Sequence, residues 1–453
     1  MFRFILCSAL LTFSTALAAP PNILLIVADD LGWNDVGFNG GTRIPTPHLD
    51  QLAADGVRLT DFRSCPMCTP TRAGLLTGRY PHRFGMMRAV VPPWSTYGLP
   101  KAEQTLPELL DASTYTHRGI VGKWHLGHTT PAHLPNQHGF TRFFGHYNGA
   151  IDYFTHEREG ELDWHDNKTP IRETGHATPL LADRAVQFIA SAPSDKPWFL
   201  YVPFNAPHSP LQAEADDLER FASIKNKRAR IYAAMVHGMD RAIGRILQAV
   251  DDKGASDNTL VWFFSDNGGI PAYASNAPWR KGKLTVYEGG TRVAAALRWP
   301  EGGLKGGRTF SERCGYIDVA PTVLSMTQTT APKNLDGINL LPSLTRGAAI
   351  PDRPWFSWMD QNESAHASIH LGPWKLIRHG SVFSPLPADR KGVELYHLDN
   401  DPGEQTNLAA RHPDRVTELN NHLQKFGAQR QAGVSAYRSG REGFVAPKDW
   451  IIE

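Results

Sequence analysis

The chain has 453 residues, with 47 Lys and Arg against 45 Asp and Glu, which gives a formal net charge of +2 at pH 7. A balance this close to neutral provides no general attraction to nucleic acid, so we expect no nucleic-acid partner. The length is enough for a large hydrophobic core and for more than one structural unit.

Residues 1–18 have the pattern of a secretory signal peptide. Arg3 precedes a mostly apolar run, and Ala16-Leu17-Ala18 supplies the small residues of a cleavage site. Cys7 lies inside the apolar run and not after it, which argues against a lipid anchor. No later stretch approaches the length of about 18 apolar residues that a spanning helix requires. We therefore expect an exported protein, periplasmic or secreted, that has no membrane partner.

Two buried strands are predicted, and each ends in oxygen-bearing side chains. Residues 22–28 are nearly all apolar and lead into Asp29-Asp30, and the apolar residues 259–264 lead into Ser265-Asp266-Asn267. Such runs are typical of strands covered on both faces of a parallel sheet, and ligands bind beyond the carboxyl ends of such strands. Carboxylate and amide oxygens suit calcium or magnesium, so the two pairs predict a metal site. For Asp29-Asp30 alone, a turn or capping pair is the alternative.

Cys68 opens a segment that is suited to binding an anion. Thr69 is a candidate helix N-cap and Pro70 a favoured first helical residue, so the free N–H groups of the helix would face the region beside Cys68. Arg72, one turn further, adds a planar cation. These residue types predict a sulfur side chain held where sulfate or phosphate binds. Two alternatives stay open: a redox or zinc-binding pair with Cys65, and a buried, inert Cys68.

Two further predicted strands are followed by residues with useful side chains. Residues 116–122 lead to Lys123 and His125, and residues 198–202 lead to His208. A solitary histidine is more often a hydrogen-bonded structural residue than a catalytic one, and a lysine is usually solvated. The residue types alone therefore leave both roles open at these three positions.

Helices are predicted to separate the strands. Thr178-Pro179 has the pattern of an N-cap and a first helical residue, and it opens a helix to about residue 190. Residues 228–250 carry apolar residues at helical spacing. Strands that alternate with helices indicate an α/β fold.

After about residue 351 the pattern changes. Residues 367–370 and 374–378 are predicted to be short strands, and 395–404 is rich in turn-forming residues. Residues 413–426 then have the pattern of a closing amphipathic helix. This mixture predicts a smaller α+β unit at the end of the chain.

The segment from Cys68 resembles the signature of the type I sulfatases. Cys68-Thr69-Pro70-Thr71-Arg72 matches Cys-x-Pro-x-Arg, and Leu76-Thr77-Gly78-Arg79 follows at the family spacing. Three further segments are similar to motifs of the family: 122–127, 206–210 and 283–290.

The resemblance covers nearly all of the chain after residue 18 and is closest to the arylsulfatase B type, an N-acetylgalactosamine-4-sulfatase. It implies an alkaline-phosphatase-like α/β fold with a mixed, largely parallel sheet flanked by helices. A catalytic domain of residues 19–350 would be followed by a smaller C-terminal α+β subdomain of residues 351–453. The segments that suggest this type are 32–38, 46–50 and 149–156.

The resemblance also implies the chemistry of the site. In this family a maturation enzyme oxidises the cysteine, here Cys68, to formylglycine, and the hydrated aldehyde is the nucleophile. One Ca²⁺ is expected at Asp29, Asp30, Asp266 and Asn267, together with residue 68. The matching catalytic positions are Cys68, Arg72, Lys123, His125, His208 and Lys283.

The implied activity is hydrolysis of a sulfuric ester on a carbohydrate. The expected substrate is a 4-sulfated galactose or N-acetylgalactosamine of a glycosaminoglycan or algal galactan. Residues 145–147 and Asp152-Tyr153 would contact the sugar, with the packing of a loop as the alternative. The charged stretch 157–178 is expected at the mouth of the pocket.

Two other functions stay open at this stage. A phosphoester or phosphonate hydrolase of the same superfamily would have a similar metal site and nucleophile. A non-catalytic binder of sulfated glycan would result if Cys68 stays a thiol. A disulfide between Cys65 and Cys314 is neither favoured nor excluded by the sequence.

Overall fold

The computed structural model describes residues 19–110, 113–360, 365–389 and 391–453. The predicted signal peptide, residues 1–18, lies outside the described residues. Within the part of the chain that is described, no helix combines the length and the apolar character needed to cross a membrane.

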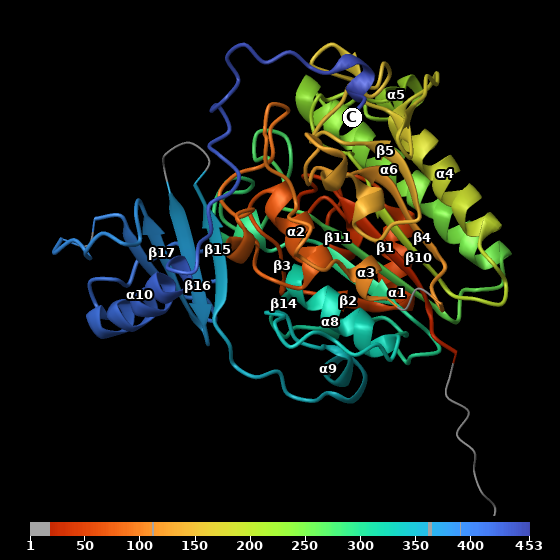
Figure 1. The fold of residues 1–453 in the computed structure, drawn as a ribbon. Helices are drawn as coiled ribbons and strands as arrows, with labels where there is room; N and C mark the ends of the chain where they lie inside the picture. Colours follow the sequence, from red (N-terminus) through yellow and green to blue (C-terminus); the bar gives the residue numbers. More distant parts are fainter. Residues whose placement is uncertain (1–18, 111–112, 361–364, 390) are drawn as a thin grey trace, which may run out of the picture.

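A ten-stranded sheet forms the centre of the molecule, in the order β13-β2-β12-β11-β1-β10-β4-β5-β8-β9 (Figure 1). β1 (Asn22–Ala28) lies between β11 (Thr259–Ser265) and β10 (Trp198–Pro203). β4 (His117–Lys123) and β5 (Arg142–His146) continue the sheet, and all five strands are parallel. The four strands that the sequence predicted here are confirmed to within one residue at each end.

The outer strands make the sheet mixed. β12 (Ala295–Arg298) is antiparallel to β11 and to β2 (Val57–Leu59), and β13 (Arg308–Phe310) is parallel to β2. At the other edge, β8 (His165–Asp166) is antiparallel to β5 and β9 (Thr169–Pro170) to β8. The mixed, largely parallel sheet that we expected is therefore confirmed.

Helices cover both faces of the sheet, which explains why its central strands are apolar throughout. Alternate residues of β1 enter two separate hydrophobic clusters, one on each face. α2 (Cys68–Thr77) and α8 (Tyr316–Met326) pack on one face, and α4 (Ala177–Ser191) and α6 (Lys227–Asp252) pack on the other. Figure 1 shows α4 and α6 lying together along the sheet.

Two helices begin earlier than the sequence predicted. α2 begins at Cys68, with Met67 as its N-cap, and not after Thr69. The hydroxyl of Thr69 instead donates to the His125 carbonyl at 3.1 Å and accepts the Val91 N–H at 3.1 Å. Its hydroxyl is thus used between loops that are remote in sequence, and it does not cap the helix.

The second helix, α4, is capped by His176 and not by Thr178. Nδ1 of His176 accepts the backbone N–H of Thr178 at 3.3 Å, which places Thr178 inside the helix. A histidine in this position carries no simple sequence signal, since Ser, Thr, Asp and Asn are the preferred N-caps.

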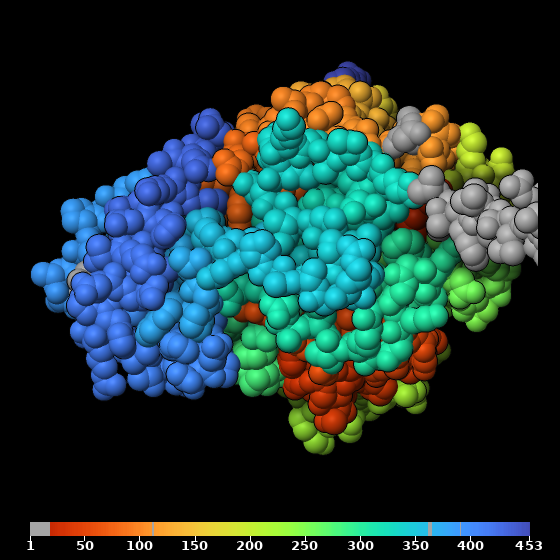
Figure 2. Space-filling view, turned by 90° about the horizontal axis from the view of Figure 1, so that it is seen from below, coloured from red at the N-terminus to blue at the C-terminus, as the bar shows by residue number. Residues whose placement is uncertain are grey.

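A smaller unit follows the main sheet and lies against its side, as Figure 2 shows in blue. Its four-stranded antiparallel sheet contains β15 (Trp355–Met359), β16 (His366–Leu371), β17 (Trp374–His379) and β18 (Val393–His397). α10 (Pro413–Gly427) contacts β16 and β17. The two predicted strands and the closing helix are confirmed. The turn-rich prediction for 395–404 is wrong at its start, because pairing with β17 draws those residues into β18.

The last residues return to the main body. In Figure 1 the chain after α10 crosses back over the larger unit, where η5 (Lys448–Trp450) contacts β7 (Glu161–Leu162). Trp450 is 1 % exposed, and its Nε1 donates to the Arg158 carbonyl at 2.9 Å.

The elements not yet given are α1 (Pro47–Asp55), α3 (Leu106–Leu109), α5 (Ala215–Arg220), α7 (Glu288–Thr291), α9 (Leu341–Arg346), β3 (Phe62–Arg63), β14 (Cys314–Gly315), β6 (Glu157–Arg158), and the 3₁₀ turns η1 (Gly37–Asn39), η2 (Pro81–Phe84), η3 (Pro131–His133) and η4 (Pro135–Gln137).

Candidate active site

The carboxyl ends of neighbouring strands deliver acidic side chains to one point. Asp29 follows β1 and Asp266 follows β11, and the register of these strands pairs the residues just before them. Ligand atoms of Asp29, Cys68 and Asp266 lie within 4.8 Å of one another, as do those of Asp29, Asp30 and His208. The structure therefore brings the two predicted oxygen pairs together, next to the start of α2.

Two fully buried cations hold two of these carboxylates. The ammonium group of Lys123 contacts Asp29. Arg72 donates to Asp266 Oδ2 from Nε at 3.0 Å and from Nη2 at 2.7 Å. Burial raises the pKa of Asp29, but the charges of Lys123 and further cations outweigh burial and hold that pKa well below its ordinary range. Asp29 is therefore ionised despite its burial, as a paired carboxylate should be.

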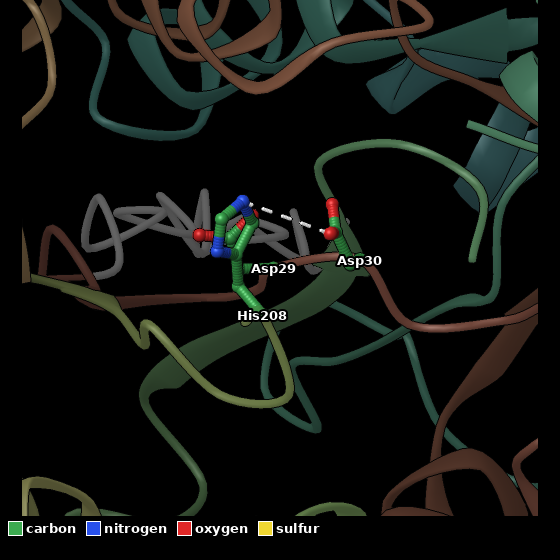
Figure 3. A group of neighbouring side chains, drawn as sticks. All are labelled: Asp29, Asp30 and His208. Atoms are coloured by element: carbon green, nitrogen blue, oxygen red, sulfur yellow. Dashed lines mark ion pairs between the residues drawn. The ribbon is translucent and has the colours of Figure 1, made fainter. Parts of the chain in front are cut away.

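Asp30 contacts a different set of groups. Lys283 Nζ lies 2.5 Å from Asp30 Oδ1, and Asn267 Nδ2 donates to the same oxygen at 2.8 Å. His208 Nε2 is 3.7 Å from Asp30 Oδ2, and Figure 3 shows this imidazole in front of Asp29, with a dashed line to Asp30. Asp30 has a φ of 68°, a left-handed conformation that Asp adopts more readily than most residues. The turn at the end of β1 thus points Asp29 and Asp30 to different partners.

Three oxygen atoms in this cluster fit a metal ion. Asp29 Oδ1, Asp30 Oδ2 and Asn267 Oδ1 are buried and have no hydrogen-bond partner among the described residues. A buried oxygen without a partner costs about 1–3 kcal/mol, so a ligand that engages all three would be stabilising. Hard oxygen donors are the ligands that Ca²⁺ prefers. The donor set therefore fits the expected calcium ion.

Cys68 is the first residue of α2 and is 2 % exposed. Burial raises the pKa of its thiol although nearby lysines oppose the shift, so an unmodified Cys68 is a neutral thiol and a poor nucleophile.

Cys65 Sγ lies 3.1 Å from the hydroxyl of Tyr316, and burial raises the pKa of the Cys65 thiol to about 12. Cys65, Cys68 and Cys314 are free, so the Cys65–Cys314 disulfide left open by the sequence is not formed. These environments favour neither a redox pair nor a thiolate.

His125 has one free ring nitrogen. Its Nε2 lies 3.0 Å from the Val91 carbonyl, which can only accept, so we assign the proton to Nε2. Nδ1 is buried without a partner in the described part of the chain. Burial and the charge of Lys123 hold the pKa of His125 well below its usual value. The ring is therefore neutral, with Nδ1 available to accept a proton.

His208 is also held in one orientation. Its Nδ1 lies 2.5 Å from the Ser209 carbonyl, which leaves Nε2 facing Asp30. Burial and then the charge of Lys283 lower the pKa of His208 to about 4. An anionic ligand beside this ring would raise that value by favouring the charged form.

Cys68, His125, His208 and Lys283 line a cavity of about 590 Å³. That volume lies in the range of pockets that bind small ligands. Arg158 and Tyr437 also line the cavity, and the sequence singled out neither residue. Arg158 falls in the stretch 157–178 that was predicted at the pocket mouth, and of those residues it alone lines the cavity. Tyr437 comes from the C-terminal tail and had no local signal.

The residues expected to contact the sugar have a different role. Tyr153 is 1 % exposed, and its hydroxyl donates to the Asn205 carbonyl at 2.5 Å and to the His208 carbonyl at 2.9 Å. Asp152 accepts the backbone N–H of Phe154 at 2.9 Å. Residues 145–147 are buried as well and do not line the cavity. For Tyr153 and residues 145–147 the alternative, in which the stretch packs a loop, is the correct one, because these residues are buried and do not line the cavity. Asp152 is partly exposed and accepts hydrogen bonds from its own loop.

An α/β sheet that presents acidic residues, a helix N-terminus and several cations to one pocket defines a class of hydrolases that act on anionic esters. A family model described as Sulfatase matches residues 21–329, and one described as N-sulphoglucosamine sulphohydrolase, C-terminal, matches residues 280–431. The chain therefore belongs to the sulfatase family, and it is a sulfuric ester hydrolase.

Individual relatives agree with this assignment. Human N-acetylgalactosamine-6-sulfatase is 35% identical over 86% of this chain and 82% of its own length. Human arylsulfatase A is 34% identical over 93% of this chain and 90% of its own length. The crystal structure of Ps i-CgsB superposes with a TM-score of 0.85 at 32% identity, covering 93% of this chain and 95% of that one. The alkaline-phosphatase-like fold with its small C-terminal sheet is thereby confirmed, and the 4-sulfatase type stays a prediction.

Proposed function

We propose that this sulfatase removes sulfate from a sulfated glycan, with a formylglycine made from Cys68 as nucleophile and one Ca²⁺ as cofactor. The observation that carries the proposal is that Cys68, which lies in one cluster with Asp29 and Asp266, lines a single cavity together with Lys283. A carbohydrate substrate is supported by the relatives, since one is named for N-acetylgalactosamine and Ps i-CgsB has a structure in complex with k-i-k-neocarrahexaose. Export, directed by residues 1–18, belongs to the same proposal.

Four side chains would hold the calcium ion together with residue 68. The buried, unpartnered oxygens of Asp29, Asp30 and Asn267 support this, as does the closeness of Asp266 to Asp29. When bound, the ion supplies positive charge to the sulfate oxygens, which lowers the cost of the charge that develops during transfer. Arg72 fixes the orientation of Asp266 through two hydrogen bonds.

Formylglycine at position 68 depends on a maturation enzyme. Its hydrate would supply the hydroxyl nucleophile toward sulfur, with the sugar oxygen as the leaving group, and release of sulfate would return the aldehyde. The chain's own residues then move the protons. Asp266 is placed to accept the proton of the attacking hydroxyl, since it lies with Cys68 in the same cluster.

The departing sugar oxygen needs a proton or a cation. His208 and Lys283 both line the cavity and both approach Asp30, so they would flank that oxygen. Lys283 is charged: burial lowers its pKa, but the charge of Asp30 together with those of neighbouring anionic groups outweighs burial and raises the pKa above its ordinary value. His125 Nδ1 would accept the remaining hydroxyl proton as sulfate is eliminated.

The finer proposal is a sulfate at position 4 of galactose or N-acetylgalactosamine. It rests on the resemblance at residues 32–38 and 149–156, and the name of the human 6-sulfatase makes the 6-position the competing outcome. Protein made in a converting host should be tested on 4-, 6- and 2-sulfated galacto-sugars, with matched phosphate esters alongside. Preference for a phosphate ester would favour the phosphohydrolase alternative. Binding without turnover by verified formylglycine protein would favour a non-catalytic glycan binder.

A further inference from the structure

Arg158 brings a cation to the cavity from outside the cluster around Cys68. Its Nη2 lies 3.4 Å from Glu159, a neighbour whose side chain is 30% exposed. Its Nε is buried and has no hydrogen-bond partner among the residues that the structure describes. A buried guanidinium N–H without an acceptor is costly, so a ligand that supplies one would be favoured.

The other cations of the pocket are already engaged. Arg72 and Lys123 are fully buried against Asp266 and Asp29, and Lys283 is 10% exposed and contacts Asp30. Among the residues that the structure describes, Arg158 has no such buried carboxylate, and its side chain is 24% exposed. Its charge is therefore the one most available to a second anionic group of the substrate.

Tyr437 places an aromatic ring beside this guanidinium. Its hydroxyl lies 3.5 Å from Arg158 Nη2. Trp94 holds Tyr437 in place, because its Nε1 donates to the Tyr437 carbonyl at 2.9 Å and the two rings meet edge to face at 5.3 Å. A tyrosine whose hydroxyl lies beside a planar cation suits a sugar ring that carries an anion.

The two residues come from segments that hold each other. Trp450 Nε1 donates to the Arg158 carbonyl, and the backbone N–H of Asp449 donates to Glu161 Oε2, both at 2.9 Å. The β6–β7 hairpin and the C-terminal tail are thus fixed against one another before any ligand binds. Such preorganisation lowers the entropic cost of recognition.

We propose that Arg158 and Tyr437 form a rim site that binds an anionic group on the sugar next to the one that carries the scissile sulfate. The inference rests on the proposed desulfation at Cys68 and adds a substrate class to it: glycans with anionic groups on adjacent sugars. Arg158 pairs with the anion, and Tyr437 contacts the ring that bears it. The anion is a sulfate or a carboxylate, which share the geometry that a guanidinium recognises.

The test compares disaccharides that carry the same scissile sulfate and a neutral, a sulfated or a uronic acid neighbour. Arg158→Met should reduce the ratio of kcat/KM for an anionic over the neutral neighbour about 10- to 100-fold, mainly through KM, as expected for losing a charged hydrogen bond. Arg158→Lys should retain part of the preference. Arg441→Met is the matched control, since Arg441 lies over Trp94 in the same tail but does not line the cavity. This control should leave the ratio unchanged.

A second measurement separates this inference from the proposed function. Calorimetry on Cys68→Ala protein, with and without Arg158→Met, measures binding of the same disaccharides without turnover. If Arg158→Met weakens binding only of the disaccharide with the sulfated neighbour, or only of the one with the uronic acid neighbour, that result identifies the anion. Weaker binding of both would indicate a general anion site. If the wild type desulfates nothing, the proposed function fails, and the binding comparison still decides the rim site. Equal weakening for neutral and anionic neighbours, or an equal effect of Arg441→Met, overturns the rim site.

Discussion

At the scale of single residues, the environment of Cys68 explains why a bare thiol would be inadequate there. Burial favours the neutral form of the thiol, and the nearby carboxylates of Asp29 and Asp266 add to this. The position is nevertheless surrounded by the groups needed to transfer an anion, with Lys283 and His125 lining the same cavity. A chemically different nucleophile at residue 68 reconciles these two observations.

The first prediction is that Cys68→Ala abolishes turnover and preserves glycan binding. Loss of the nucleophile should lower kcat by at least about 1000-fold, since the remaining groups cannot form the covalent intermediate. Steady-state kinetics and calorimetry on the same preparations measure both properties. Mass spectrometry of the wild-type peptide should show the mass loss of a cysteine-to-formylglycine change. Residual activity in the Ala variant near the wild-type rate would rule out Cys68 as the nucleophile precursor.

The second prediction concerns Gly149, which makes room for His125. A Cβ added at Gly149 would lie 2.3 Å from His125 Nε2 and 2.4 Å from Cε1. Gly149→Ala should therefore displace the imidazole and lower kcat, with a smaller effect on thermal stability. Gly403→Ala is a control, because its added Cβ would meet no atom closer than 3.4 Å. A Gly149→Ala variant with the wild-type kcat would argue against a catalytic role of His125.

At the scale of elements, the site depends on how strands and helices meet. β1 and β11 end side by side, and each contributes part of the acidic cluster. The small unit is attached through aromatic packing, in which His82 of η2 stacks on Phe426 of α10 with ring centroids 4.5 Å apart. The β1–β11 junction contains buried carboxylates and the η2–α10 junction contains buried His82. The stability of each junction should therefore depend on metal or on pH.

The third prediction is that metal removal loosens the junction of β1 and β11. A chelator should lower the thermal unfolding temperature together with activity, and added Ca²⁺ should restore both, because an ion bound only by the folded state stabilises it. Asp266→Ala protein is the control and should show a smaller response to chelator. Active, purified protein without any divalent metal would show that the calcium assignment is wrong.

The fourth prediction is a pH dependence that arises at the η2–α10 junction. Burial lowers the pKa of His82 from 6.5 to about 4, although its Nε2 lies 3.2 Å from the Gly427 carbonyl. The folded-state pKa of His82 lies below its unfolded value. The contribution of the neutral ring to the free energy of unfolding is therefore complete above pH 6.5 and is lost as the pH falls toward 4. Between pH 7 and 5 the free energy of unfolding should fall by about 2 kcal/mol.

The measurement for this junction is the unfolding temperature of wild-type and His82→Phe protein at pH 7 and 5. The phenylalanine keeps an aromatic ring on Phe426 and cannot titrate, so the drop at pH 5 should be smaller in the variant. Other buried histidines affect both proteins equally. Identical drops in the two proteins would contradict the role of His82.

At the scale of the whole molecule, a buried ionic network connects the small sheet to the catalytic body. Lys375 Nζ on β17 lies 2.9 Å from Glu288 Oε1 and 2.7 Å from Glu404 Oε1, and all three side chains are fully buried. Glu404 Oε2 also accepts the backbone N–H of Glu288 at 2.8 Å. Since Glu288 follows Lys283 by five residues and begins α7, the small unit helps to fix the segment that carries Lys283 into the pocket.

The fifth prediction is that Lys375→Met destabilises the protein by about 3–5 kcal/mol, because it leaves the buried carboxylate of Glu404 without its cation, while Glu288 keeps Arg63 at 2.7 Å. The exposed pair of Arg415 and Glu418 provides the control, where Arg415→Met should cost at most about 1 kcal/mol. Thermal or denaturant unfolding of the three proteins measures the difference. Equal effects of the two substitutions would show that the network is not a stabilising link.

The sequence alone was enough to predict the central strands, the two oxygen pairs and the segment of Cys68, because these depend on local patterns of apolar and polar residues. The family resemblance selected Lys283 among several neighbouring cations, and the structure places that lysine beside Asp30.

Tertiary structure alone decided which partners several side chains have, because local sequence patterns do not encode contacts between remote segments. The hydroxyl of Thr69 is used by loops around residues 91 and 125, so it does not cap α2. Tyr153 is buried by its bonds to the loop of His208, and Arg158 meets Tyr437 across 279 residues of chain. These contacts arise only when remote segments pack together, which is why the shape of the pocket rim could not be derived from the sequence.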